Sequence, residues 1–147
     1  MHRDPLLRPR ILLACTPDDE PVLRIALAGL DAEVVGAHAH DEALREIARG
    51  IDLVVCSLRF DESRMFDFIA EVGRERPRLP FICCRVLESH LPERALRAAF
   101  AAAGHLGAVA VVNLPELVRH VGALRARADL RETVRAQVHG AAQASMT

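Results

Sequence analysis

Residues 51–60 read IDLVVCSLRF and have the form of a buried strand that ends in polar side chains. Four apolar residues follow Asp52, and Ser57 comes directly after them. An uninterrupted apolar run of this length is typical of a parallel strand that is covered on both faces. Because functional groups of open parallel sheets gather at the carboxyl ends of the strands, Cys56 and Ser57 stand where a site is expected.

This apolar stretch is one of five, and segments of helical periodicity separate them. In residues 41–50, for example, the apolar side chains fall on one side of a helix and the charged ones on the other. Strands that alternate with helices predict an α/β fold, in which helices cover both faces of a parallel sheet. The expected strands are residues 11–15, 32–37, 52–57, 79–84 and 108–112, and the expected helices are residues 21–30, 41–50, 63–77, 92–104 and 115–138.

The composition is typical of one soluble domain. A chain of 147 residues is long enough to form a full hydrophobic core. The net charge of −1, with five Phe and no Tyr or Trp, gives neither a basic patch nor an aromatic platform for nucleic acid. The amino terminus lacks the apolar run of a signal peptide, and no apolar stretch is long enough to span a bilayer. We therefore expect a cytoplasmic protein that binds neither nucleic acid nor membrane.

All 19 basic residues are Arg, and the chain contains no Lys. This absence excludes mechanisms that need a lysine amine, such as Schiff-base chemistry or the phosphate-binding lysine of nucleotide-binding loops. No general base or orienting acid stands beside Ser57 or a cysteine in the sequence, so we do not expect an enzyme. The sequence also carries no motif for a cofactor.

The chain has four cysteines, Cys15, Cys56, Cys83 and Cys84, and their spacing matches no zinc motif. Disulfides are rare in a reducing compartment, so buried thiols are expected. The alternative is a redox or soft-metal sensor, because Cys15, Cys56 and Cys84 fall near the carboxyl ends of expected strands.

Two histidines, His38 and His40, follow the expected second strand. Alternating histidines can bind a metal ion, but the sequence offers no third ligand beside them. We therefore expect solvated loop histidines.

Four stretches share their order and spacing with a known family: RILLA (10–14), EVVGAHAHDEAL (33–44), DLVVCSLRFDESRMFDFI (52–69) and GAVAVVNLP (107–115). Together they resemble the CheY-like receiver domain of two-component response regulators. The resemblance covers roughly residues 8–127. It implies a three-layer flavodoxin-like fold of five β-α units, with a parallel sheet in the order 2-1-3-4-5. Residues 128–147 would then form a C-terminal helical extension and tail.

The resemblance also implies that the phosphotransfer residues are missing, which would make the chain a degenerate member, or pseudo-receiver. The phosphoacceptor Asp of the family falls on Ser57, five residues after Asp52. The lysine that follows the fifth strand falls on Leu114, the hydroxyl residue that ends the fourth on Arg85, and the aromatic switch position on Val111. An acyl phosphate needs a carboxylate acceptor, which Ser57 does not provide.

The acid pair that holds Mg²⁺ in the family allows two registers. Continued directly from the first strand, the pair falls on Cys15 and Thr16. Shifted by three residues, it falls on Asp18 and Asp19, which stand just before a helix-starting proline. Should these acids reach the pocket, an ion pair with Arg85 would replace both the metal and the lysine.

The function that the resemblance implies is a phosphorylation-independent signalling module that binds another signalling protein. Its partner surface would be formed by the fourth helix, the fifth strand and the fifth helix. Residues 117–138 carry a broken apolar stripe, which either extends the fifth helix into a homodimer or partner contact or frays in solvent. The alternative function is a small-ligand or thiol-based sensor at the strand ends around Cys15, Ser57, Cys84 and Arg85.

Overall fold

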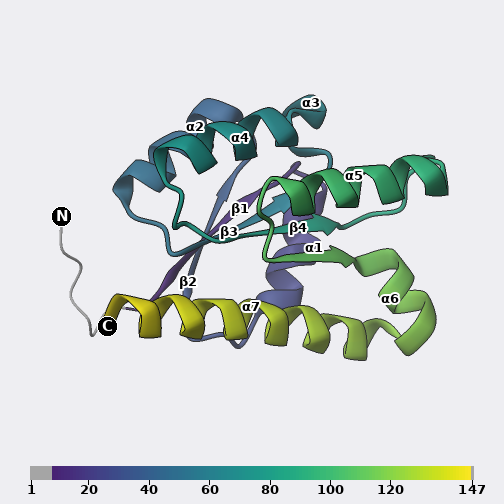
Figure 1. Ribbon diagram of the computed structural model, residues 1–147. Coiled ribbons are helices and arrows are strands. Elements are labelled where there is room, and N and C mark those ends of the chain that lie inside the picture. Colours follow the sequence, from purple (N-terminus) through teal and green to yellow (C-terminus); the bar gives the residue numbers. More distant parts are fainter. Residues whose placement is uncertain (1–7, 147) are drawn as a thin grey trace.

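The computed structural model describes the backbone of residues 8–146 and the side chains of residues 8–139. Five parallel strands form one sheet in the order β2-β1-β3-β4-β5, which confirms the predicted topology. Helices cover both faces of this sheet, so the fold has three layers (Figure 1). The strands are β1 (Arg10–Ala14), β2 (Glu33–Ala37), β3 (Leu53–Ser57), β4 (Phe81–Arg85) and β5 (Ala110–Asn113).

The helices divide into two groups, one on each face of the sheet (Figure 1). One face is covered by α1 (Asp19–Leu27), α6 (Leu114–Val121) and α7 (Ala123–Met146). The other face is covered by α2 (His40–Arg49), α3 (Phe60–Ser63), α4 (Met65–Glu75) and α5 (Glu93–His105). Within the described residues, no helix has both the length and the apolar character needed to cross a membrane.

The central strand β3 is buried at all five of its positions. Successive side chains of a strand point to opposite faces. Leu53 and Val55 therefore pack against the α1 and α7 side, whereas Val54 and Cys56 pack against the α4 side. Burial on both faces explains why this segment reads as an uninterrupted apolar run in the sequence.

The connection from β3 to α4 contains a backbone turn that the sequence does not predict. Residues 63–77 were expected to form one helix, but the helix α4 starts at Met65 and follows the single turn α3. Asp61, Glu62 and Ser63 have φ angles of 46°, 56° and 68°, in the left-handed region that non-glycine residues rarely adopt. The Asp61 carboxylate accepts the backbone N–H of His40 at 3.0 Å and so ties the turn to the start of α2.

The helix expected over residues 115–138 is interrupted at Gly122. This residue has a φ of 87°, which glycine adopts without the steric cost that a Cβ would impose. The backbone N–H of Gly122 still bonds to the carbonyl of Val118 and closes α6. The chain then reverses, and α7 runs back beside α1 (Figure 1).

The apolar stripe of α7 packs inside the molecule. Ala126, Leu130, Val134 and Val138 recur every four residues and belong to the same hydrophobic cluster as β1 and β3. This burial corrects the expectation that the extension frays in solvent, because these four side chains are covered within the chain. Ala126 and Leu130, which lie on either side of residue 127, pack in one core.

The packing of α7 predicts a large difference between two leucines of this helix. Leu130 is 1% exposed and Leu124 is 81% exposed. Leu130→Ala should lower the free energy of unfolding by about 2–5 kcal/mol, because it leaves a cavity in the core. Leu124→Ala is the matched control and should change it by no more than about 0.5 kcal/mol. Urea denaturation measures both, and equal effects would contradict the docking of α7.

Candidate functional site

A pocket of about 500 Å³ opens at the carboxyl ends of the strands. Its floor is formed by three polar side chains from different elements: Asp19 of α1, Ser57 of β3 and Arg85 of β4. Loops that follow β3 and β4 form the walls, with Leu58, Arg59, Ser63, Val86, Leu87, Glu88, Ser89, His90 and Leu91. The position matches the expectation that polar groups gather at this edge of a parallel sheet.

Asp19 and Ser57 are joined by a buried hydrogen bond. The Ser57 hydroxyl donates to Oδ2 of Asp19 at 2.7 Å and accepts the backbone N–H of Arg59 at 3.2 Å. Asp19 and Ser57 are each 1% exposed. The Asp19 backbone N–H donates in turn to the side-chain oxygen of Thr16 at 3.1 Å, which fixes the start of α1. Both roles of the serine hydroxyl are therefore already used within the protein.

Arg85 lines the same pocket but contacts other partners. Its guanidinium donates to the backbone carbonyl of Ser89 at 3.2 Å and to Oδ1 of Asn113 at 3.5 Å. No ion pair joins it to Asp19 among the described residues, so the predicted neutralising pair is not present. Two buried atoms of the pocket, Asp19 Oδ1 and Arg85 Nε, lack a hydrogen-bond partner in the described part of the chain.

Neither of the two predicted registers for the acid pair brings both of its residues into the pocket. Asp19 alone enters the pocket, whereas Asp18 is exposed at the start of α1. Thr16 supports the helix start and does not line the pocket, and Cys15 is buried beside β2. The two-acid arrangement fails because α1 begins at Asp19, and neighbouring residues of a helix point in different directions.

Leu114 also lies outside the pocket. It is buried in the core on the α1 side, directly after the last residue of β5. Asn113 stands next to the pocket in its place, and sequence reasoning missed this residue. Its side chain accepts the backbone N–H of Glu116 at 3.3 Å and donates back to the Glu116 carboxylate at 3.2 Å. The sequence signal was present, because Asn followed three residues later by Glu is typical of a helix start.

The four cysteines do not form one group. Cys15 and Cys84 lie in the core on the α1 side, whereas Cys56 and Cys83 lie in the core on the α4 side. All four are fully buried. Of the three thiols that were predicted at neighbouring strand ends, the sheet therefore separates Cys56 from Cys15 and Cys84.

Burial makes these thiols poor nucleophiles. It raises the pKa of Cys83 to about 12, and burial together with the nearby Glu20 and Asp19 carboxylates raises the pKa of Cys15 to about 12. The pKa values of Cys56 and Cys84 are also raised, mainly by burial. The reactive species is the thiolate, so each thiol combines low access with a low thiolate fraction.

The receiver resemblance implies a Mg²⁺ ion at this edge of the sheet, and the residues present do not fit it. Such ions are held by one or two carboxylates together with phosphate oxygens. Of the predicted acids only Asp19 lines the pocket, and one of its oxygens is taken by Ser57. The Arg85 guanidinium, a fixed positive charge, lines the same space.

The fold matches solved receiver domains, although no family model and no curated protein matches the sequence. A CheY-like response regulator receiver domain from Methanospirillum hungatei gives a TM-score of 0.67 at 18% identity, over 92% of this chain and 98% of that one. A response regulator from Thermotoga maritima gives 0.68 at 18% identity, over 90% and 99% of the two chains. A redox sensor of the streptococci, of a family that evolved from two-component response regulators, gives 0.66 at 18% identity, over 90% and 52%. The chain therefore has the CheY-like receiver fold.

The buried contact between Ser57 and Asp19 predicts a measurable coupling. In a double-mutant cycle of Ser57→Ala and Asp19→Ala, the free energies of unfolding should be non-additive by about 1.5–3 kcal/mol, the range for a hydrogen bond to a charged group. Urea denaturation of the four proteins measures this. As a control, Ser57→Ala combined with the exposed Leu124→Ala should be additive within about 0.5 kcal/mol. A coupling near zero in the first cycle would contradict the contact.

The buried thiols predict slow chemical modification. A disulfide reagent added to the folded, metal-free protein should react slowly with all four cysteines, and the rate should still be rising at pH 9, where the rate for an ordinary thiol of pKa about 8.5 levels off. The reason is that the pKa values of Cys15 and Cys83 lie near 12. The same reagent should react with four thiols at once in urea. One fast thiol in the folded protein would refute this prediction and favour a thiol-based sensor.

Proposed function

We propose that this chain is a receiver-like signalling module that does not accept a phosphoryl group. Partner proteins would bind it in a single, fixed conformation. The observation that carries the proposal is the buried hydrogen bond of Ser57 to Asp19. At the end of β3, where the resemblance puts an acceptor carboxylate, a neutral hydroxyl is instead held inside the protein. The phosphoryl group of an acyl phosphate has no acceptor there.

The charge distribution of the pocket supports this proposal. The chain has no lysine, and Leu114, which matches the family's lysine position, is buried in the core. The cation on the floor of the pocket is Arg85, which comes from β4 and is held by Asn113 and Ser89. Because these contacts hold the guanidinium in one place, the pocket does not need a phosphoryl group to set its state.

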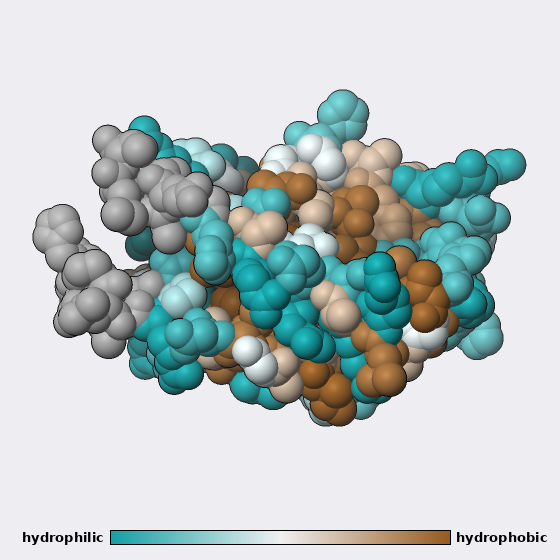
Figure 2. Space-filling view, turned by 90° about the horizontal axis from the view of Figure 1, so that it is seen from below, coloured by the Kyte–Doolittle hydropathy of each residue, from teal (hydrophilic) through white to brown (hydrophobic). Residues whose placement is uncertain are grey.

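The proposed partner surface lies on α5, β5 and α6, as the resemblance implies. Apolar side chains are exposed there at Leu106, Val109, Val111, Val118 and Val121. Hydrophobic side chains also appear toward the α6 end of the molecule in Figure 2, which views it from the α7 side. Exposed apolar groups that lie close together are typical of protein contact sites. We assign this module to the cytoplasm and expect its output to come from a partner protein.

A second candidate function is a small-ligand sensor. It is favoured by the two buried atoms in the pocket that lack a partner in the described residues, Asp19 Oδ1 and Arg85 Nε. A ligand that offers a donor to the first and an acceptor to the second would satisfy both. The thiol-based version of this sensor is less well supported. One structural neighbour belongs to a redox-sensor family, but the thiols of this chain are buried.

The phosphorylation proposal is tested with acetyl phosphate and Mg²⁺. Incubation should leave the intact mass of the chain unchanged, because the serine hydroxyl is buried and no carboxylate stands at its position. A receiver domain that accepts phosphate from acetyl phosphate, treated in parallel, shows that the reagent is active. An added phosphoryl group on this chain would overturn the proposal. If Ser57→Asp gains a phosphoryl group under the same conditions, the missing acceptor alone explains the inactivity.

A further inference from the structure

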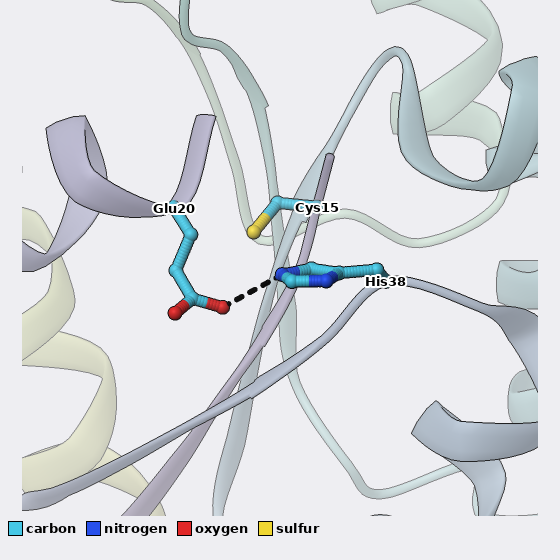
Figure 3. A group of neighbouring side chains, drawn as sticks. All are labelled: Cys15, Glu20 and His38. Atoms are coloured by element: carbon cyan, nitrogen blue, oxygen red, sulfur yellow. Dashed lines mark hydrogen bonds and ion pairs between the residues drawn. The ribbon is translucent and has the colours of Figure 1, made fainter. Parts of the chain in front are cut away.

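We propose that Cys15, Glu20 and His38 form a zinc-binding site. Their ligand atoms, one from each residue, lie within 4.8 Å of one another, and the three side chains converge in Figure 3. None of them lines the pocket described above. The proposed zinc site is therefore separate from the pocket and does not depend on the proposed function.

The strand register brings Cys15 and His38 together. β1 and β2 pair in parallel with Ala14 opposite Ala37, so the next residue of each chain segment follows at the same edge. The backbone N–H of Cys15 bonds to the carbonyl of Ala37 at 3.1 Å, which extends the ladder past the end of β1. Two ligands that are 23 positions apart in the sequence are thus neighbours held by backbone hydrogen bonds.

A glycine in β2 makes room for the third ligand. Glu20 comes from the first turn of α1, and its carboxylate lies directly over Gly36. A Cβ on Gly36 would stand only 2.0 Å from Oε1 of Glu20. Glycine inside a strand often marks a close approach by another group. Gly36 therefore creates the space in which the carboxylate reaches His38 and Cys15.

Hydrogen bonds orient the carboxylate within this group. Nε2 of His38 lies 2.9 Å from Oε1 of Glu20, and Nε of Arg24 donates to Oε2 at 3.1 Å. Arg24 thus holds one oxygen from outside the group, as a hydrogen-bonding partner does for a metal-bound carboxylate. The other oxygen and the imidazole nitrogen point at each other, and an ion would enter between them.

The donor set fits zinc better than the hard divalent cations. A thiolate, an imidazole and a carboxylate are zinc ligands, whereas Mg²⁺ and Ca²⁺ prefer oxygen. Bond lengths of about 2.0–2.3 Å put neighbouring ligand atoms of a tetrahedral site roughly 3.5 Å apart, so modest side-chain rotations close the group. Cys15 is buried and the His38 side chain is 40% exposed, so the ion would enter from the solvent side and keep one water.

Binding exchanges a proton for the metal ion. The Cys15 Sγ–H bond breaks as the sulfur–zinc bond forms, and the proton goes to solvent. No oxidation or reduction takes place. The carboxylates of Glu20 and Asp19, which disfavour a free thiolate at Cys15, attract the cation.

Cobalt is the first probe of this site. The full chain, freed of metal with a chelator, is titrated with Co²⁺ and then with Zn²⁺. We expect one ion per chain, a sulfur-to-cobalt charge-transfer band in the near ultraviolet, and loss of the band when Zn²⁺ displaces Co²⁺. Cys15→Ser should abolish the band, and His38→Gln should weaken binding. Absence of the band in the unaltered chain would overturn the proposal.

Two further variants distinguish a specific zinc site from nonspecific zinc binding. His40→Gln is the matched control, because His40 pairs with Glu71 instead. It should bind Zn²⁺ as the unaltered chain does. Gly36→Ala should keep the fold, since only the end of a flexible side chain must move, yet weaken zinc binding by about 10- to 100-fold. Circular dichroism and urea denaturation without metal check the folding of each variant.

If Gly36→Ala does not fold, Glu20→Gln makes the same test, because an amide is a poorer zinc ligand than a carboxylate. Equal weakening by His38→Gln and His40→Gln would indicate an adventitious ion only and would overturn the site. Unchanged affinity in both Gly36→Ala and Glu20→Gln would also overturn it, since Glu20 would then not be a ligand. In that case Glu20 and His38 form only an ion pair over a buried thiol.

Discussion

The parallel pairing of β1 with β2 and β3 is the constraint on which the rest of the structure depends. Parallel strands bring their carboxyl ends to one edge, and the register decides which residues meet there. The pairing with β3 places Ser57 beside the start of α1, where Asp19 reaches it. The pairing with β2 places Cys15 beside His38. The two ladders of β1 therefore create the pocket and the proposed zinc site, one on each side of β1.

The sheet could be predicted from the sequence because each strand carries its own signal. The strand predicted at 52–57 is buried on both faces, which explains its continuous apolar residues. Its predicted start differs from the observed start of β3 by one residue. The course of α7 could not be predicted in this way. Its apolar stripe is equally compatible with solvent, a dimer or the core. The choice among these depends on the chain reversal at Gly122. An isolated glycine in a helical pattern does not predict a chain reversal.

Counting along the sequence placed three residues of the candidate site in the pocket, although it left two registers open for Asp19, put Leu114 at a position that is buried in the core, and missed Asn113 at the end of β5. Ser57 and Arg85 end strands, so counting along the chain places them in the pocket. Asp19 and Leu114 begin helices, where a shift of one residue turns a side chain by about 100°. The group of Cys15, Glu20 and His38 has no sequence signal, because its members meet only through the strand register.

The docking of α7 has a consequence for how the chain folds during its synthesis. Arg131 donates to the carbonyl of Ala26, a contact that spans 105 positions of sequence. Until the segment from Ala126 to Val138 leaves the ribosome, one hydrophobic side of the nascent sheet is covered by α1 and α6 but lacks α7. A contact between such distant parts of a chain forms late and slows folding. The helix α7 is thus made after the whole sheet that it covers, and the core around β1 stays partly exposed until α7 docks.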